Sequence, residues 1–313
     1  MTVHTLGLTP ALDVVYVLDE VRAGAIHRPP VVLRSAGGKS LNVARALALL
    51  GVPARAVAPL GGRIGDLVAE LLARSDGTGA GTVELDRIPT AVETRLCITA
   101  CDTGARSLTE FYEPVTEFDV APGEIASRLA VAHPGEWLTV SGAAPAGIDA
   151  AAFAELLAAE SARGVLLAVD VHGPTLGAIV ERARPRLVKV NRAEAADLTG
   201  AATGEESARQ LVARGAAIAV VTDGEAGSVA ATADGDLVVA PPVDRPGLFP
   251  VGSGDCYLAG LVAALDAGAD LQRALEVAAA AGAANAQVPG AARFDPAEVN
   301  LSEVHEVAPI PAE

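Results

Sequence analysis

Short apolar runs of strand length alternate with longer helical patterns along most of the chain, and this alternation restricts the fold more than any other feature. The strand-like runs cover residues 3–8, 54–59, 137–140, 165–169, 187–190 and 217–221. The helical patterns cover residues 40–50, 64–74, 150–163, 205–214, 255–267 and 271–287. Such alternation is typical of an α/β fold with a mostly parallel sheet covered by helices on both faces. Because no internal repeat or linker divides the 313 residues, we expect one domain spanning 1–313.

Two segments interrupt the alternation. Residues 11–36 and 89–116 contain β-rich stretches without a following helix. They predict an antiparallel flap, a small β-sheet lid beside the main layers. A lid that closes over bound ligand would exclude water from a reaction that water could spoil.

The charge balance argues against several classes of partner. With 39 acidic and 23 basic residues, the net charge is −16, which repels nucleic acid. No apolar run reaches the roughly 18 residues of a membrane span, and the first residues lack signal-peptide features, so we expect a cytoplasmic protein without membrane contact. The three cysteines, Cys97, Cys101 and Cys256, match no zinc pattern and are expected to be reduced.

Lysine is almost absent from this chain. Only Lys39 and Lys189 occur, and the other 21 of the 23 basic residues are arginines. The compact ammonium group suits tight phosphate contacts where a planar guanidinium does not fit. Because both lysines also stand in glycine- or asparagine-containing motifs, a functional role is favoured over chance survival.

The strongest motif lies at residues 251–255, where Gly252, Ser253, Gly254 and Asp255 lead into an apolar helical pattern. Glycines allow a tight turn, and the amides at a helix start form an anion-binding site. A carboxylate beside that site can accept a proton from an attacking hydroxyl while the amides stabilise a moving phosphoryl group. The motif therefore predicts Asp255 as a general base and residues 252–254 as an anion hole, and a simple N-cap is the structural alternative.

The segment Gly37-Gly38-Lys39-Ser40 superficially resembles a P-loop. A P-loop needs a glycine five residues before Gly38, where Leu33 stands, so that interpretation fails. Glycines permit close approach of a ligand, Lys39 supplies charge, and Asn42 lies on the first helical turn. The segment predicts a ligand site, with a structural turn as the alternative.

Two further loops follow predicted strands. Asn191 and Glu194 stand three residues apart, which suits either a hydrated Mg²⁺ near phosphates or a helix-capping pair. Thr222, Gly224 and Gly227 mark a loop that could face a nucleotide. Ligands in open α/β sheets bind at the carboxyl ends of the strands, so all these loops are expected to converge.

Taken together, these motifs resemble the ribokinase-like carbohydrate kinases of the PfkB family, in the branch that contains 1-phosphofructokinase and tagatose-6-phosphate kinase. The motifs that carry the resemblance span nearly the whole chain and lie at residues 8–13, 36–44, 61–66, 94–95, 140–142, 189–194 and 251–255. The resemblance implies a three-layer α/β core with a small β lid. It also implies transfer of the γ-phosphate of ATP, with Mg²⁺, to a hydroxyl of a sugar or sugar phosphate.

The resemblance also assigns residues to binding roles. It implies acceptor-binding roles for Asp13, Gly38, Lys39, Asn42 and Arg95; nucleotide-binding roles for Lys189, Asn191, Thr222, Gly224, Gly227 and Asn285; and a magnesium role, through water, for Asn191 and Glu194. A homodimer formed through the lid is compatible with the sequence.

The lid departs from the branch pattern. An Asn and a Lys usually follow the lid Arg, and this chain has Cys97 and Thr99 instead. The region of Tyr112 and Glu113 departs as well. A phosphosugar could still be held by Lys39 and Arg95, with Arg28, Arg34 or Arg106 compensating for the missing cation.

Three functions therefore compete. The first is a kinase for a hexose monophosphate such as fructose 1-phosphate or tagatose 6-phosphate. The second has the same chemistry on an unphosphorylated sugar, nucleoside or specialised metabolite, and it follows from Cys97 and Thr99. The third is a non-catalytic binding protein, which the presence of Asp255, the glycines and Lys39 argues against.

Overall fold

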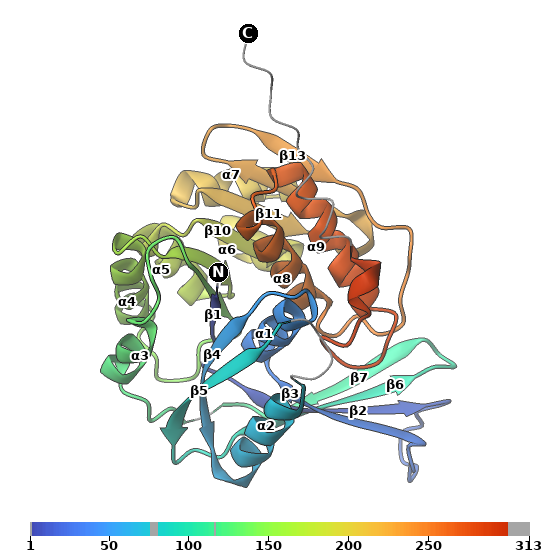
Figure 1. Ribbon diagram of the computed structural model, residues 1–313. Coiled ribbons are helices and arrows are strands. Elements are labelled where there is room, and N and C mark those ends of the chain that lie inside the picture. Colours follow the sequence, from blue (N-terminus) through green and yellow to red (C-terminus); the bar gives the residue numbers. More distant parts are fainter. Residues whose placement is uncertain (1, 76–80, 116, 300–313) are drawn as a thin grey trace.

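The computed structural model describes residues 2–75, 81–115 and 117–299, and these form two sheets and two layers of helices (Figure 1). The large sheet contains β1 (Val3–Leu6), β4 (Ala54–Gly61), β5 (Val83–Thr90), β8 (Trp137–Ser141), β9 (Leu166–Asp170), β10 (Leu187–Asn191), β11 (Ile218–Thr222), β12 (Ser228–Thr232) and β13 (Leu237–Ala240). Within the described residues its order is β13-β12-β11-β10-β9-β8-β1-β4-β5. The strands from β5 to β11 are parallel, and β12 and β13 extend one edge with antiparallel pairs.

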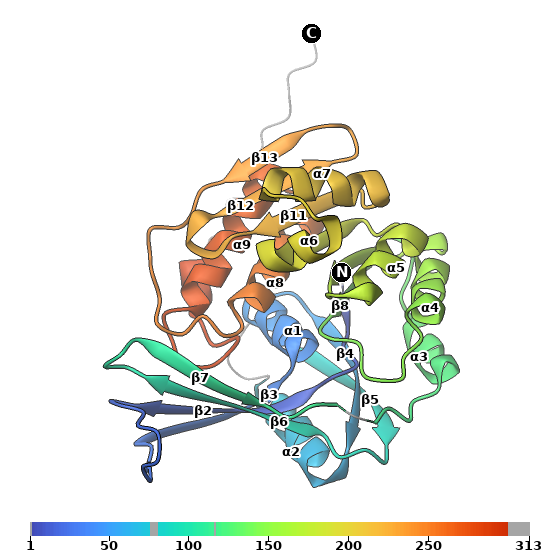
Figure 2. The same ribbon diagram turned by 180° about the vertical axis from the view of Figure 1, so that it is seen from behind.

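Helices cover both faces of the large sheet, as the two opposite views in Figures 1 and 2 show. One face carries α1 (Lys39–Leu49), α2 (Gly62–Ser75), α8 (Ser253–Asp266) and α9 (Leu271–Asn285). The other face carries α3 (Pro122–Leu129), α4 (Ala150–Ala162), α5 (Pro174–Ala183), α6 (Arg192–Thr199) and α7 (Gly204–Arg214). The strands between them are almost continuously apolar because side chains on both faces are buried.

This architecture confirms the predicted three-layer α/β core. All six predicted strands and all six predicted helices are present, with ends displaced by no more than a few residues. The sequence interpretation missed β5, β12 and β13 and the helices α3 and α5, and of α6 it predicted only the start, at Asn191.

A smaller sheet of four strands stands beside the main layers (Figure 1). Its strands are β2 (Ala11–Leu18), β3 (Val31–Gly37), β6 (Arg95–Asp102) and β7 (Ser107–Tyr112), in the order β3-β2-β6-β7. The outer pairs are antiparallel, but the central pair β2–β6 is parallel. The prediction of a wholly antiparallel flap was therefore wrong, because the two inner strands come from segments far apart in the chain and run in the same direction.

The carboxyl ends of the central strands bring polar residues into one row. Ser141 ends β8 opposite Asp170, which ends β9, and Asn191 ends β10 opposite Thr222, which ends β11. The helices α1 and α8 begin next to this edge. Among the described residues, no helix combines the length and apolarity that crossing a bilayer requires.

Candidate active site

The turn before α8 presents two unpaired amides. Gly252 has a φ of 84°, and a Cβ at this position would lie 2.3 Å from the Cβ of Ala291, so only glycine fits. The Ser253 amide donates to the carbonyl oxygen of Pro250 at 3.0 Å. In the described part of the chain, the amides of Gly252 and Gly254 donate to no protein acceptor. The two glycine amides are therefore available to a ligand, whereas the Ser253 amide is already occupied.

Asp255 lies on the first turn of α8 and is buried, with 6% of its surface exposed. The side-chain amide of Asn42 on α1 donates to its Oδ2 at 2.9 Å. Burial raises the pKa of Asp255 to about 7, although Lys39, Asn42 and Lys189 oppose the increase. A carboxylate with that pKa can accept a proton near neutral pH, which a general base must do.

Lys39 and Lys189 meet at a residue that the sequence interpretation missed. Asp170, the last residue of β9, accepts a bond from Lys39 Nζ through Oδ1 at 2.8 Å and from Lys189 Nζ through Oδ2 at 3.0 Å. It is 1% exposed. Its position directly after a buried strand is the signal that could have identified it, because the same rule selected Asn191 and Thr222.

The predicted acceptor residues gather at the start of α1. The carboxyl group of Asp13 on β2 lies beside Gly38 and Asn42, which both act to lower its pKa, and a Cβ at Gly37 would lie 2.0 Å from Asp13 Cγ. Burial raises the pKa of Asp13 to about 6, and the charges of Arg45 and Arg95 oppose this effect. The structure therefore places Asp13, Gly38 and Asn42 together, and Asn42 links them to Asp255.

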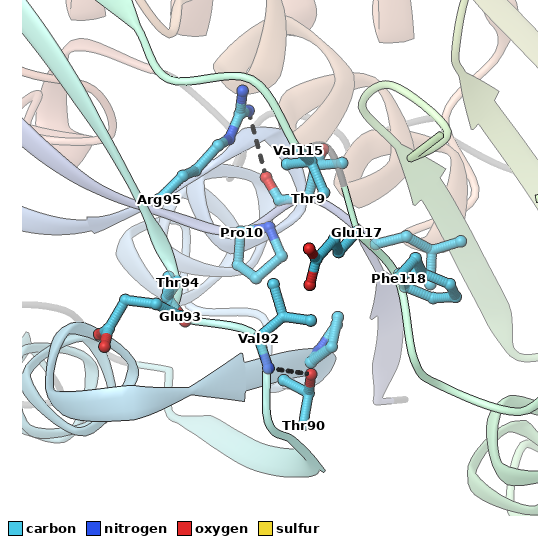
Figure 3. Close-up of a pocket in the computed structure, with 12 residues that line it drawn as sticks. Thr9, Pro10, Thr90, Val92, Glu93, Thr94, Arg95, Val115, Glu117 and Phe118 are labelled. Carbon is cyan, nitrogen blue, oxygen red and sulfur yellow. Dashed lines mark hydrogen bonds between the residues drawn. The ribbon is translucent and has the colours of Figure 1, made fainter. Parts of the chain in front are cut away.

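Arg95 begins β6 and spans the junction between the small sheet and the core. Its guanidinium donates to the carbonyl oxygens of Thr9 at 3.3 Å and Glu113 at 3.2 Å. Figure 3 shows Arg95 at one side of a pocket that also contains Glu117 and Phe118. That pocket has a volume of only about 40 Å³, so it holds a few waters and not a sugar phosphate.

Cys97 and Thr99, the residues of the small sheet that depart from the branch pattern, lie where they would meet a ligand. Cys97 pairs with Asp13 in the register of β2 and β6, and therefore shares its face of the sheet. Of the arginines expected to compensate, Arg34 pairs with Val14 and points to the opposite face. Arg106 lies in the β6–β7 turn at the far end of the strands, and Arg28 is exposed in the loop after β2. Arg34 and Arg106 therefore do not share with Asp13 and Cys97 the face and the end of the sheet where compensation was expected.

A cleft of about 580 Å³ opens on the other side of the glycine turn. Its walls include the predicted loop residues Thr222, Gly224 and Gly227, and Gly254 lies at one end. The sequence interpretation missed most of the remaining lining, which comes from Pro241, Pro242, Val243, Asp244, Arg245, Pro246, Gly247, Pro250 and Tyr257. Its volume suits a ligand of nucleotide size.

Asn285 lies on α9, which borders this cleft, but its side chain does not line it. Its amide nitrogen donates to the carbonyl oxygen of Val251 at 2.9 Å and to Ser253 Oγ at 3.2 Å. Its oxygen accepts a bond from the amide of Ala292 at 2.8 Å. Asn285 therefore holds the glycine turn against α9 and does not present its amide to the cleft.

Asn191 and Glu194 form a capping box at the start of α6. Asn191 Oδ1 accepts from the Glu194 amide at 2.9 Å, and Glu194 Oε2 accepts from the Asn191 amide at 3.0 Å. The other carboxylate oxygen, Oε1, lies 3.9 Å from Lys39 Nζ. The capping interpretation is thus confirmed, while Glu194 Oε1 still faces the site.

The oxygen donors at this edge fit Mg²⁺. Among the residues described, no group of three or more His, Cys, Asp or Glu side chains is arranged to enclose a metal. Mg²⁺ needs no such cage, because it keeps several waters and takes one or two carboxylates together with phosphate oxygens. Glu194 would supply the carboxylate, with Asn191 fixing its orientation.

These features define the class of the molecule: an α/β protein in which a cleft of nucleotide size, a glycine turn and a buried carboxyl group meet at the start of α8. The profile of the pfkB family carbohydrate kinases matches residues 3–298, so the chain belongs to that family. It is an ATP-dependent sugar kinase. The family resemblance seen in the sequence is thereby confirmed.

Individual relatives agree with this assignment. The chain is 33% identical over 288 residues to a 1-phosphofructokinase of Xanthomonas campestris pv. campestris, covering 88% of both chains. It is 32% identical over 290 residues to a 1-phosphofructokinase of Rhodobacter capsulatus, covering 90% of this chain and 89% of the relative. The crystal structure of phosphofructokinase-2 from Escherichia coli in complex with substrates and products matches with a TM-score of 0.86 and 23% identity, covering 97% of this chain and 99% of that chain.

Proposed function

We propose that the protein transfers the γ-phosphate of ATP to a hydroxyl of a hexose monophosphate of the fructose 1-phosphate or tagatose 6-phosphate type. Asp255 is the general base, and the amides of Gly252 and Gly254 form the anion hole. The observation that carries this proposal is the buried Asp255 carboxylate, which Asn42 orients and which directly follows Gly254, the second of the two glycines with unpaired amides.

The reaction follows from this arrangement. The Asp255 carboxylate accepts the proton of the acceptor hydroxyl as its oxygen attacks the γ-phosphorus, and the bond between that phosphorus and the bridging oxygen of ADP breaks. The amides of Gly252 and Gly254 donate to the transferring phosphoryl group without reorganising. Lys39 and Lys189 add positive charge on the two sides of Asp255. Mg²⁺, when bound, supplies further neutralisation of the phosphate charge.

The phosphorylated acceptor is supported by two observations. Arg95 places a cation beside Asp13, the residue expected to hold a sugar hydroxyl, and Lys39 places one beside Asp255. The two relatives with 32–33% identity are both named 1-phosphofructokinase. Arg95 would have to release the carbonyls of Thr9 and Glu113 to bind a phosphate directly.

An unphosphorylated acceptor is the second candidate. The face of the small sheet that carries Asp13 also carries Cys97 and Thr99, which are buried and uncharged. Glu110 pairs with Thr99 on the same face and adds a negative charge, which opposes binding of a phosphate there. The same transfer chemistry on a neutral sugar or nucleoside fits this wall of the site.

A coupled ADP-release assay separates the two candidates. The panel contains fructose 1-phosphate, fructose 6-phosphate, tagatose 6-phosphate, free hexoses and nucleosides, each with Mg-ATP. Turnover confined to the phosphorylated sugars supports the first candidate, and turnover only on neutral acceptors replaces it with the second.

The role of Asp255 is tested with Asp255→Asn, which removes the base and keeps the shape. We expect kcat to fall by about 100-fold or more. Asp149→Asn is the matched control, because Asp149 caps α4 and asparagine caps equally well. Full activity of Asp255→Asn would contradict the proposed mechanism.

We also propose that the protein forms a homodimer through the small sheet. Both outer strands, β3 and β7, have one free edge in the described structure. Each of these strands carries two large apolar side chains with substantial exposure: Val32 and Phe111 lie on one face of the sheet, and Val31 and Tyr112 lie on the other. Such edges and patches mark interaction surfaces.

A further inference from the structure

One carboxylate binds both lysines of the chain. Lys39 comes from the start of α1 and Lys189 from the middle of β10, yet each ammonium contacts a different oxygen of Asp170. Every other basic residue among the 23 is an arginine. A lysine ammonium is a compact point charge that three donors can anchor, whereas a guanidinium needs a wider planar partner. Both lysines of the chain are therefore found at the same carboxylate, where two compact ammonium groups fit.

We propose that Asp170 is a positioning residue for phosphoryl transfer, whose carboxylate holds Lys39 on the acceptor side and Lys189 on the donor side of Asp255. This inference rests on the proposed function. It extends that function by adding Asp170, which contacts neither substrate itself. Asp170 instead fixes Lys39 and Lys189, the two residues that would contact the substrates.

The location of the two ammonium groups supports this role. A Cβ built on Gly254 would lie 2.9 Å from Lys189 Nζ, so the lysine lies directly against the anion-binding turn. Lys39 Nζ lies between Asp170 and Glu194, at 2.8 Å and 3.9 Å. Lysine side chains have four rotatable bonds, and the shared carboxylate restricts both of them at once. Transfer needs positions held within a fraction of an ångström, which such a restriction provides.

Asp170 also contributes to the charge around Asp255. The charged groups that face Asp255 are Lys39 from α1, Asp170 from β9 and Lys189 from β10. The lysines lower the pKa of Asp255, and the Asp170 carboxylate raises it. The neighbouring thiol of Cys256 is directed away, toward Asn285 Oδ1 at 3.4 Å. Removing the Asp170 charge leaves two cations unopposed, so the pKa of Asp255 should fall.

A second carboxylate in the molecule provides a matched control. Asp86 on β5 also bridges two cations: Oδ2 pairs with Arg55, and Oδ1 with Arg128 at 2.6 Å. Its side chain is 9% exposed. It lies on β5, the edge strand of the large sheet that is separated from β10 and Lys189 by four strands. Asp86→Asn should reproduce the cost of unpairing two cations without touching the site.

The experiment compares Asp170→Asn and Asp86→Asn with the wild-type protein. Melting temperature reports folding, and kcat, KM for ATP, KM for the acceptor and the pH dependence of kcat/KM report function. We expect Asp170→Asn to lower kcat at least about tenfold and to move the acid limb of kcat/KM to lower pH by roughly half a unit or more. Asp86→Asn should lower the melting temperature only. A folded Asp170→Asn with an unmoved acid limb and unchanged kcat would overturn the proposal.

Asp170→Glu covers the case in which the asparagine variant does not fold. It keeps the charge but displaces the two ammonium groups by the length of one methylene. We expect a wild-type acid limb together with a kcat reduced at least about tenfold. Wild-type kcat in Asp170→Glu would overturn the positioning role. If Asp255→Asn retains activity, the proposed function fails; if it loses activity while Asp170 variants match the Asp86 control, only this inference fails.

Discussion

Two buried carboxyl groups determine how the activity should depend on pH. Asp255 has a pKa raised to about 7 and Asp13 one raised to about 6, both because burial disfavours the charged form. Asp255 can accept a proton only when it is charged, so activity should be lost as the pH falls through its pKa. We expect kcat/KM to fall below about pH 7 and to fall more steeply below about pH 6.

A pH series of kcat/KM checks this expectation, with Asp13→Asn as the comparison. That variant should lose the steeper part below pH 6 while it keeps the limb near pH 7. A wild-type profile that stays flat down to pH 5 would show that neither carboxyl group needs its charge for catalysis.

Gly252 is required at its position for two reasons, its backbone conformation and the lack of space for a side chain. A comparison with Gly135 separates the two. A Cβ there would meet both a left-handed φ of 84° and the Cβ of Ala291 at 2.3 Å. Gly135 has nearly the same φ, 86°, with no atom within 4 Å of a Cβ. Gly135→Ala should therefore cost about 1 kcal/mol of unfolding free energy, the backbone penalty alone, and keep kcat.

Gly252→Ala should cost more stability and also displace the unpaired amides. We expect kcat to fall about tenfold or more, because loss of a single anion-hole donor has effects of this order. Chemical unfolding and steady-state kinetics on both variants test this. Equal kcat in Gly252→Ala and Gly135→Ala would argue against an anion hole at this turn.

At the scale of secondary structure, the capping box of α6 combines a structural role with the proposed magnesium role. Glu194 occupies the third helical position of α6, and Glu206 the same position in α7, which Thr203 caps. Glutamine maintains a capping box, so Glu194→Gln and Glu206→Gln should both leave the unfolding free energy within about 0.5 kcal/mol of wild type.

Only Glu194→Gln should change the response to Mg²⁺, because only Glu194 faces Lys39 and the site. We expect the Mg²⁺ concentration for half-maximal activity to rise about tenfold. A magnesium titration of both variants measures this. An identical titration for the two variants would leave Glu194 with its capping role alone.

The elements that could be predicted from the sequence are those with a strong period or a long apolar run. Helix α3, which was missed, and α6, of which only the start was predicted, have eight residues each, too few for a clear helical period. Strand β5 contains charged residues and Pro89, because as an edge strand it is only partly buried. The parallel pairing of β2 with β6 was beyond reach, since strand direction there depends on tertiary contacts and not on local pattern.

The site residues that could be predicted from the sequence are likewise those with a clear local pattern. Motifs that combine glycine with a functional side chain, such as residues 251–255 and 37–42, were identifiable because turn geometry and chemistry coincide there. Asp170 has no glycine motif beside it; its place after a buried strand could have marked it as a site residue, but its bridge between the two lysines emerges only when the fold joins α1, β9 and β10. The proline-rich wall of the cleft was missed because most of its residues contribute shape alone, and its charged residues Asp244 and Arg245 stand in no recognisable motif.

At the scale of the whole molecule, the small sheet extends from the core with both outer strands open (Figure 1). Phe111 is 61% exposed on β7 and Val32 is 39% exposed on β3. A monomer would leave this apolar surface and two free strand edges in water. Pairing with a second copy would bury both, and we expect a dimer by light scattering coupled to size-exclusion chromatography.

The combined variant Val32→Asp and Phe111→Asp places charges in that surface and should shift the protein to monomer, because an unpaired buried charge is costly. Val239→Asp is the control: Val239 is 60% exposed, but it lies on β13 at the edge of the large sheet. It should leave the dimer intact.

Because Asp13 and Arg95 stand on the strands of the small sheet, loss of the dimer should also raise KM for the acceptor more than KM for ATP, whose proposed cleft lies among β11, α8 and α9. A wild-type protein that stays monomeric at every concentration, or a double variant that dimerises as well as the control, would show that this surface serves no self-association.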